Sequence, residues 1–379
     1  MNTTDVYWDK EDAPSVHPVV LRLRTLLILI ISFLIIASNI INLLVLRTTV
    51  QIPSISRYCL INLSSADFLV GCVSCAPCVV TSALDRWIYG AVWCQIAAII
   101  HGCSVTVSIW SLALISVDRY FAIVHPLRYH SLMTSLRCRI VIASFWTVSM
   151  MTFVFPLTLK RSFVYYRYSL VESICGLYWE YGWFCVLTAI YIPILSGTIL
   201  AVTNFQIVRT VLAMNKHNSG HVTSDGQSIR PSGANGATSD VRATYNDLVS
   251  DGQTAEVSVV VDATPVGDAQ NDGKRTRKKT NKSRDVKAVK VLGVTAVTYF
   301  LAWGPYVSSV VITSFFPGIP LPDWFRFTVM WIANSNSFMN VIIYSVMYSS
   351  FRKNVCNLIR TCFTCRFWSR TGSRVHPAN

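Results

Sequence analysis

Seven apolar stretches, each long enough to cross a lipid bilayer as a helix, constrain this chain more than any other feature of its sequence. They cover residues 25–47, 58–82, 91–121, 138–158, 182–212, 287–313 and 322–347. A helix of roughly 20 apolar residues spans the hydrocarbon core and pairs its own backbone polar groups, which lipid cannot do. With 52% hydrophobic and only 14% charged residues, the chain is also too apolar for an ordinary soluble domain of this length. The sequence therefore predicts an all-α integral membrane protein built as a bundle of seven transmembrane helices.

The basic residues predict how this bundle is oriented. Seven crossings place the two termini on opposite sides, and segments poor in Lys and Arg are expected outside. With the N-terminus outside, the outer segments hold only eight of the 33 Lys and Arg residues. These eight are Lys10, Arg22, Arg24, Arg86, Lys160, Arg161, Arg167 and Arg326. Arg22 and Arg24 depart locally from the rule, but the total predicts an N-terminus on the outer side and a cytoplasmic C-terminus. The net charge of +14 then faces anionic lipid, and a nucleic-acid partner is not expected.

The segments between and beyond the helices complete the predicted organisation. Residues 1–24 are an extracellular tail without the apolar core of a cleavable signal peptide, and Asn2 opens a glycosylation sequon in it. Residues 25–214 hold the first five helices and residues 285–348 hold the last two. Residues 215–284 are rich in Gly, Ser, Asp, Thr and Asn and end in a basic run. We expect a disordered third cytoplasmic loop whose basic end lies against lipid headgroups rather than acting as a localisation signal.

Residues 349–379 begin with an amphipathic pattern. Phe351, Val355 and Leu358 fall on one helical face beside basic residues, which predicts a short interfacial helix followed by a cytoplasmic tail. Three cysteines in this segment are expected to be palmitoylated, because the cytosol does not favour disulfides. They are Cys356, Cys362 and Cys365. Zinc binding by a Cys-x-x-Cys pair is the weaker alternative, since no second ligand pair is present.

The third stretch ends in Asp118-Arg119-Tyr120, followed by Pro126-Leu127. Arginine does not release its proton in proteins, so an Asp–Arg pair at the edge of a membrane requires a reason. This run resembles the cytoplasmic end of the third helix in rhodopsin-like (class A) G-protein-coupled receptors. Landmarks of that family occur in all the predicted helices, among them Asn39, Asp67, Trp146, Pro156, Pro193, Trp303, Pro305, Asn340 and Tyr344. The resemblance implies a receptor for an extracellular ligand with a heterotrimeric G protein as partner, and arrestin and receptor kinases as further partners.

The resemblance also implies a two-state switch. Arg119 is expected to pair with Asp118 and with Asp285 in the resting state, and Trp303 to act beside a hinge at Pro305. Asp285 lies twenty residues before Pro305, roughly 30 Å along a helix, and therefore near the inner membrane face. A solvated acid next to the basic run is the alternative. The switch and G-protein residues expected on this basis are Asp118, Arg119, Tyr120, Asp285, Trp303, Pro305, Asn340 and Tyr344.

Two positions depart from the family pattern. Val341 stands where the Asn-Pro-x-x-Tyr motif of the seventh helix has its proline, which puts the usual bend of that helix in doubt. Ala201 stands where the fifth helix often has a tyrosine that partners the arginine in the active state. Both departures are expected to alter basal activity or switching.

Asp67 is a carboxylate in the middle of the second predicted helix, a position that is costly and usually functional. By resemblance it holds an allosteric sodium ion, and hard cations do prefer oxygen ligands. The expected ligands are Asp67, Ser108, Asn336, Ser337 and Asn340, with Asn39 close by. The alternative is a protonated acid that is hydrogen-bonded to its neighbours. No other cofactor is implied.

The expected ligand cavity lacks the marks of two well-known receptor classes. His101 stands where receptors for biogenic amines carry an acid, and Ala333 where opsins carry their retinal lysine. A non-aminergic receptor is therefore expected, although His101 is also consistent with a purely structural role. The sixth and seventh helices, which lack the usual proline of the seventh, resemble an orphan-type branch of the family. By resemblance the cavity is lined by His101, Val105, Trp303, Tyr306, Val310 and Met330.

Cys94 lies at the outer start of the third predicted helix and Cys175 in the second outer loop, and both face a compartment where a disulfide forms readily. The family's first outer loop resembles the run Trp87-Ile88-Tyr89-Gly90, which strengthens this pairing. The bond would hold the aromatic second outer loop, including Tyr165 and Tyr166, over the bundle, where the loop could act as a built-in ligand.

Two rival functions have less support in the sequence. A transporter or channel would need several polar residues along a path, yet Asp67 is the one acid well inside the predicted bundle. An enzyme would need a cluster of His, Asp or Glu inside the membrane, and the sequence offers none. Catalytic residues are not expected.

Overall fold

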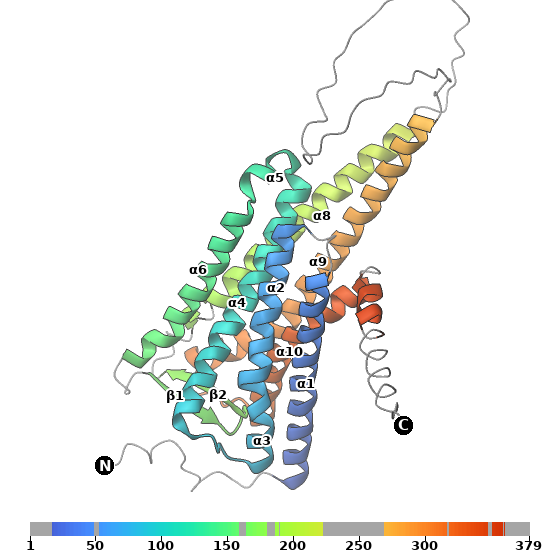
Figure 1. The fold of residues 1–379 in the computed structure, drawn as a ribbon. Coiled ribbons are helices and arrows are strands. Elements are labelled where there is room, and N and C mark those ends of the chain that lie inside the picture. The colour runs from blue at the N-terminus through green and yellow to red at the C-terminus, as the bar shows by residue number, and fades with distance from the viewer. Residues whose placement is uncertain are drawn as a thin grey trace, which may run out of the picture. The chain divides into compact units, whose positions relative to one another are not determined.

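The computed structural model describes residues 17–48, 53–158, 164–179, 186–188, 190–222, 269–316, 318–347, 351–358 and 360. Helices dominate the described part, and a single hairpin interrupts them (Figure 1). The elements in chain order are α1 (Pro18–Thr48), α2 (Ser54–Leu69), the π-helix η2 (Val70–Cys75), α3 (Ala76–Leu84), α4 (Gly90–Val124), α5 (Pro126–Leu132), α6 (Ser135–Val154), the 3-10 helix η3 (Phe155–Thr158), β1 (Val164–Ser169), β2 (Ile174–Trp179), the π-helix η4 (Ile190–Ile194), α8 (Leu195–Val222), α9 (Ala269–Phe315) and α10 (Asp323–Met347). We name the two ends of the bundle by the elements that they carry, the α5 end and the hairpin end.

All seven predicted membrane-crossing stretches are helical where the structure describes them. Six helical runs in the described residues are long and apolar enough to cross a membrane. The seventh helix, α10, is less apolar because it carries Asn334, Asn336 and Asn340, whose side chains are buried. Since α10 packs against α1 and α2, these asparagines face the interior of the bundle rather than lipid.

The second and fifth crossings are not regular α-helices throughout. The second crossing changes to a π-helix over Val70–Cys75, just before Pro77. The π-helix η4 likewise contains Pro193. Proline has no N–H to donate, so the helix in front of it lacks one regular hydrogen bond and widens locally.

The helices on both sides of the expected third inner loop extend into it. Residues 215–222 continue α8 and residues 269–284 begin α9, while residues 223–268 lie outside the described part. Lys and Arg are good helix formers, which favours helix in the basic run that the sequence assigned to the loop. Residues 211–285 form a compact unit of their own, and the site described below belongs to the other unit.

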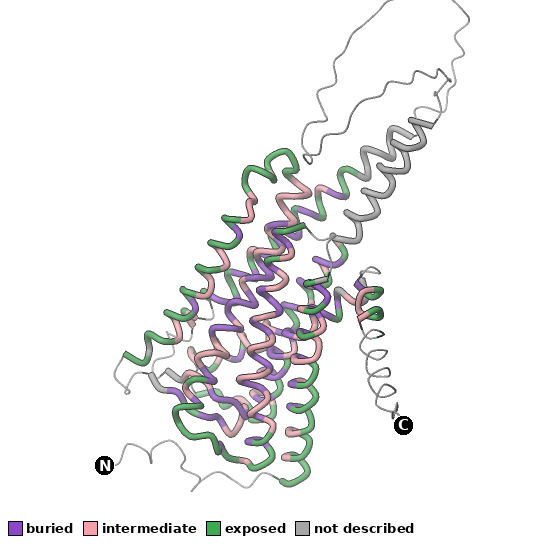
Figure 2. Tube along the Cα trace, viewed as in Figure 1, coloured by how far each residue is buried: buried purple, intermediate pink, exposed green. Residues whose placement is uncertain are grey.

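The interior of the bundle is packed and its lipid-facing surface is apolar. Buried residues concentrate on α2 and α4, whereas many residues of α1 and α6 are exposed (Figure 2). Large apolar side chains such as Phe33 and Met151 are 67% and 68% exposed. This is the expected arrangement when the surrounding solvent is lipid, because apolar surface costs nothing there.

The hairpin lies between α6 and η4 and was expected only as a loop. β1 and β2 pair antiparallel, with Tyr166 opposite Leu177 and Tyr168 opposite Cys175. The predicted disulfide between Cys94 and Cys175 is confirmed, with the two Cα atoms 5.5 Å apart. The hairpin is therefore tied covalently to the start of α4.

The amphipathic segment after α10 is helical over residues 351–358. Phe351 is buried against Val45 of α1 and Val341 of α10, and Val355 and Leu358 pack on the same cluster. The apolar face predicted for this short helix is thus the face that contacts the bundle, while Cys356 is exposed.

Candidate functional site

The carboxylate of Asp118 is the centre of a hydrogen-bonded cluster at the α5 end. It has no exposed surface. Arg119 Nη2 lies 2.6 Å from its Oδ2, and Arg119 Nε donates to the same oxygen at 3.0 Å. Ser56 of α2 donates to Oδ2 at 2.8 Å and accepts a hydrogen bond from Arg119, while Tyr129 of α5 donates to Oδ1 at 2.8 Å. The cluster therefore joins α2, α4 and α5 through one buried acid.

The Tyr129 hydroxyl is held in its donor form. Burial, together with the neighbouring Asp118 carboxylate, raises the pKa of Tyr129 above its ordinary value. The hydroxyl is consequently protonated throughout the physiological range and can donate to the acid. Tyr120, next to Arg119, contacts His125 instead, with its hydroxyl 3.1 Å from Nε2.

The structure describes the side chains of some predicted switch residues but not of all. The side chains of Asp285 and Tyr344 lie outside the described residues. Ser56, by contrast, has a clear role that the sequence did not predict, because a lone serine at the start of a helix carries no signal. The sequence gives no partner for Tyr129 either.

Trp303 lies on α9 and packs inside the bundle. It packs on a cluster that contains Leu112 of α4 and Leu200 of α8. Its ring meets that of Tyr306 edge to face at 5.8 Å, and its Nε1 is buried without a hydrogen-bond partner in the described part of the chain. α9 continues without a break through Pro305.

One contact joins α9 to the π-helix η4 just below Trp303. The hydroxyl of Tyr299 donates to the Pro193 carbonyl at 2.6 Å. Gly197, one turn further on, allows the two helices to approach closely, because a Cβ there would lie 3.1 Å from the rings of Tyr299 and Phe300. The fifth and sixth crossings are thus joined by a side-chain hydrogen bond at Pro193.

Asp67 lies at the centre of the bundle with no exposed surface. The side chains of Ser108, Ser337 and Asn340 surround its carboxylate. Nevertheless, both carboxylate oxygens, the Ser108 hydroxyl and the Asn39 carbonyl oxygen are buried and have no hydrogen-bond partner among the described residues. Unpaired buried oxygens around a carboxylate fit a hard cation, which would supply the missing interactions.

The remaining members of the predicted ion site hold one another in position. Asn39 donates through Nδ2 to the Ser337 carbonyl at 2.9 Å and joins α1 to α10. Asn340 donates to the Asn336 carbonyl at 3.4 Å. Asn336 itself is buried, as the sequence interpretation requires.

A second polar junction was not predicted from the sequence. Asn62 of α2 donates to Ser111 of α4 at 2.8 Å and accepts from Trp146 Nε1 of α6 at 2.9 Å. Because this buried amide uses both its nitrogen and its oxygen, it fixes how α2, α4 and α6 are each rotated about their own axes. Trp146 is one of the family landmarks in the sequence, but sequence spacing does not predict which residues it contacts.

Three of the predicted cavity residues belong to two neighbouring apolar clusters. Val105 packs on both of the large apolar clusters, the one that includes Met330 and the one that includes Trp303. His101 is half-buried, and its Nδ1 is buried without a hydrogen-bond partner in the part that the structure describes. Val310 is half-buried on α9.

The hairpin contributes buried residues of its own. Tyr166 and Tyr168 are buried, and the ring of Tyr168 lies 5.4 Å from that of Trp87. The Tyr166 hydroxyl donates to the Phe153 carbonyl at the end of α6. The side chain of Tyr165, the other residue considered for a built-in ligand, lies outside the described residues.

Comparison with known proteins identifies the relatives of this arrangement. The profile of the family described as "7 transmembrane receptor (rhodopsin family)" matches residues 38–344. The alpha-1A adrenergic receptor of Mus musculus is 27% identical over 335 residues, which are 86% of this chain and 66% of that receptor. The alpha-1A adrenergic receptor of Homo sapiens is 26% identical over 337 residues, again 86% and 66%. The chain thus spans just under two thirds of the length of these relatives. The crystal structure of squid rhodopsin has the same fold, with a TM-score of 0.70 at 18% identity over 100% of this chain and 98% of that one.

Proposed function

The chain belongs to the rhodopsin family of seven-transmembrane receptors, and we propose on that premise that it transmits an extracellular signal to a heterotrimeric G protein at the plasma membrane. The observation that carries this proposal is the cluster in which Arg119, Ser56 and Tyr129 surround the buried Asp118. The family match gives no support to the transporter or channel alternative, or to an enzyme.

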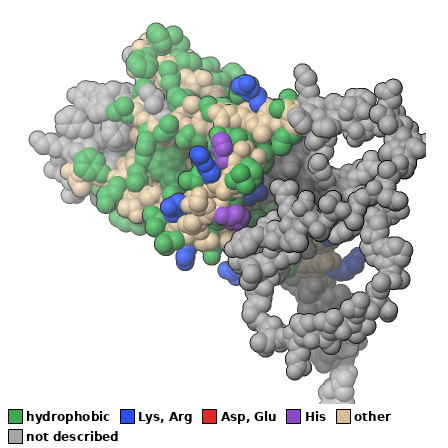
Figure 3. All heavy atoms as spheres, turned by 90° about the horizontal axis from the view of Figure 1, so that it is seen from above, with side chains coloured by type: hydrophobic (Ala, Val, Ile, Leu, Met, Phe, Trp, Pro, Cys, Tyr) green, Lys and Arg blue, Asp and Glu red, His purple; other side chains and the backbone are tan. Residues whose placement is uncertain are grey.

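The charge of the α5 end supports placing it in the cytoplasm. Viewed onto that end, the described surface carries Lys, Arg and His side chains and shows no Asp or Glu side chain (Figure 3). Asp118, the acid at this end, is buried beneath Arg119. A basic surface beside the anionic inner leaflet agrees with the orientation predicted from the sequence.

The proposed mechanism is a change of partners by Arg119. In the resting state the guanidinium is held by Asp118 and Ser56. An agonist that favours a different packing of Trp303 biases α9 at the Pro305 hinge, the inner end of α9 moves outward, and Arg119 turns to the C-terminal helix of Gα. Any ligand acts through its different affinities for the two states.

We further propose that Asp67 binds an allosteric sodium ion together with Ser108, Asn336, Ser337 and Asn340. The orphaned oxygens of Asp67, Ser108 and Asn39 support this ion site over a protonated acid that is fully hydrogen-bonded. The ion would stabilise the packing of α2, α4 and α10 that surrounds it, and so the resting state.

The remaining proposals concern ligand class and modification. Because His101 stands in place of the amine-binding acid, the receptor is proposed to be non-aminergic even though its adrenergic relatives are named for an amine. Asn2 is the proposed glycosylation site, and the exposed Cys356, with Cys362 and Cys365, the proposed palmitoylation sites. Arrestin and receptor kinases are the further partners proposed for the cytoplasmic side.

The first test measures dissociation of each Gα class in cells that express the chain at graded levels. At least one Gα is expected to dissociate more as expression rises, and Arg119→Ala should lower that signal roughly tenfold or more, about 1.4 kcal/mol of coupling free energy. Arg22→Ala removes an exposed arginine at the opposite end and is the matched control. A panel without any response, or an Arg119→Ala variant that signals like the native chain, would contradict the proposal.

The sodium site is tested on the purified receptor through its thermal unfolding. The native chain should melt at a higher temperature in sodium chloride than in choline chloride of the same ionic strength, because an ion that binds only the folded state stabilises it. Asp67→Asn should melt at one temperature in both salts. A variant that keeps the sodium effect would exclude Asp67 as its ligand.

A further inference from the structure

Two arginines from different helices hold the turn of the hairpin, residues 170–173. Arg24 of α1 donates to the Ser173 hydroxyl at 2.7 Å and to two backbone carbonyls of the turn. Arg326 of α10 pairs with Glu172 Oε1 at 3.1 Å. These are two of the outer basic residues, and Arg24 is one of the two that depart from the charge rule for membrane proteins.

Asp85 and Asp323 act on the charge of Arg24 only from beyond ion-pair distance. No carboxylate of the described residues lies within ion-pair distance of its guanidinium, which is bound by neutral oxygens. Its Nε is buried and lacks a hydrogen-bond partner within the described chain. The guanidinium also lies over the Phe327 ring, 4.9 Å from its centroid. A partly buried cation held only by neutral groups binds an anion more strongly than it binds a carbonyl.

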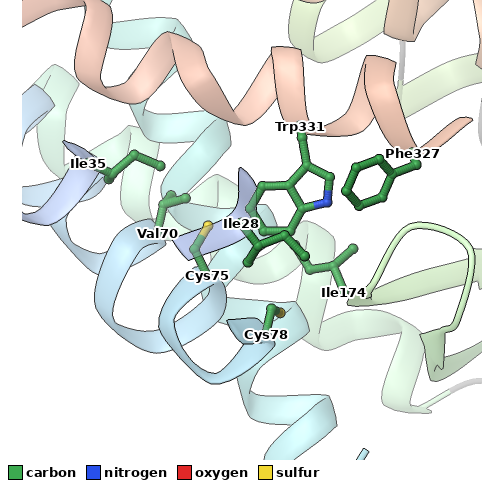
Figure 4. Packing of buried hydrophobic residues seen from close by; sticks show 8 residues of the cluster. All are labelled: Ile28, Ile35, Val70, Cys75, Cys78, Ile174, Phe327 and Trp331. Carbon is green, nitrogen blue, oxygen red and sulfur yellow. The ribbon is translucent and has the colours of Figure 1, made fainter. Parts of the chain in front are cut away.

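An apolar seat adjoins these arginines. Ile174, the residue after the turn, has no exposed surface and packs among Ile28, Phe327 and Trp331 (Figure 4). Trp331 also donates through Nε1 to the Glu172 carbonyl at 2.9 Å. The hairpin therefore makes three kinds of contact with the bundle. The Glu172 carboxylate pairs with Arg326, and oxygen atoms of the turn accept hydrogen bonds from Arg24. Next to them, the aliphatic side chain of Ile174 is buried.

We propose that the hairpin turn occupies a binding site for an anion with an apolar body, either a fatty carboxylate or the phosphate of a lysophospholipid. The anionic head displaces the turn oxygens from Arg24 and takes the place of Glu172 on Arg326. The apolar body replaces Ile174 beside Trp331 and Phe327. This inference names the ligand class of the proposed receptor and rests on that proposed function, but its test needs no G protein.

The test uses four probes with the same twelve-carbon chain: dodecanoate, dodecyl phosphate, dodecanol and dodecylamine. The full-length receptor in lipid nanodiscs is unfolded by heat with each probe. One of the two anions is expected to raise the melting temperature at a concentration at least roughly tenfold below that needed for dodecanol, a difference of about 1.4 kcal/mol. Whichever anion is stronger identifies the carboxylate or the phosphate source. Equal effects of dodecanol and both anions, or no effect of either anion, would overturn the proposal.

Hydrogen exchange distinguishes displacement of the turn from binding elsewhere. Amides of residues 170–174 should exchange faster when the effective anion is bound, because their contacts with Arg24 and Trp331 are lost. Slower exchange there would mean that the probe lies on top of a turn that stays in place, and would overturn the displacement.

Paired variants test the role of Arg24. Arg24→Gln should bind the anion no better than dodecanol, whereas Arg22→Gln, an exposed cation two residues away on α1, should keep the native preference. Should Arg24→Gln fail to fold, Arg326→Gln serves instead, because this arginine is 34% exposed at the rim. Retention of the native preference by the variant that folds would overturn the proposal. Loss of G-protein coupling with intact anion binding would count against the proposed function alone.

Discussion

Asp118 shows how a single buried charge organises the side chains around it at the α5 end. Removing an unpaired carboxylate from water costs several kcal/mol, so the acid is retained only where donors surround it. Arg119, Ser56 and Tyr129 supply these donors from three elements. Weakening any one of them should therefore favour the state in which Arg119 is released.

Tyr129→Phe tests this dependence. The change removes one hydrogen bond to an ionised group, roughly 1.5–3 kcal/mol, while the ring keeps its packing. The melting temperature is expected to fall and basal nucleotide exchange on Gα to rise. Tyr58→Phe, which removes the hydroxyl of an exposed tyrosine on α2, is the control and should change neither quantity much. If the two variants behave alike, Tyr129 does not hold Asp118 in the resting state.

The sequence could identify the acids but not all of their partners. Asp118 and Asp67 are conspicuous because charges inside predicted membrane helices are rare. Ser56 and Asn62 are ordinary polar residues, and their roles depend on how each helix is rotated about its axis. That rotation follows from packing across the bundle, which a single sequence does not encode in any local pattern.

α10 lacks the proline that its family usually has in this helix, and it runs unbroken from Asp323 to Met347. Val341 occupies the position and is buried against Phe351 of the short helix that follows. In a regular helix the N–H of residue 341 donates to the carbonyl of residue 337, which here also accepts from Asn39. The substitution therefore keeps a hydrogen bond and adds a packing contact.

Val341→Pro should destabilise the receptor although it restores the common motif. Proline removes the N–H and strains the preceding turn, at about 3 kcal/mol in a helix interior. Val341→Ala loses the packing on Phe351 alone and separates the two effects. The proline variant is expected to melt clearly below the alanine variant. Equal melting temperatures would indicate that α10 already tolerates a bend at this point.

Helices were predictable here because their length and apolar content follow from the bilayer. The π-helices η2 and η4 were not, even though Pro77 and Pro193 were visible, because proline permits a widened turn without dictating one. The hairpin was also missed. Its strands are short, and much of its burial comes from the bundle rather than from an alternating pattern of its own.

The hairpin connects parts of the chain that are far apart in sequence. It is bonded to Cys94 of α4, accepts hydrogen bonds from Arg24 of α1 and Trp331 of α10, and donates one to Phe153 at the end of α6. Four crossings therefore meet at one two-stranded element. The hairpin end of the bundle should be only as stable as the attachment of this hairpin.

The disulfide is the covalent part of that attachment and gives the sharpest test of it. Cys94 and Cys175 are 81 residues apart, a separation for which chain entropy gives about 4–5 kcal/mol of stabilisation. That figure is an upper bound in a membrane, because helices that remain inserted after unfolding already restrict the chain. Cys94→Ala combined with Cys175→Ala should lower the melting temperature, and reductant should no longer affect it. Cys72→Ala, which removes a half-buried free thiol, should leave both the melting temperature and the effect of reductant as in the native chain. If the double variant melts like the native receptor, the contacts of Arg24 and Trp331 alone are sufficient to hold the hairpin on the bundle.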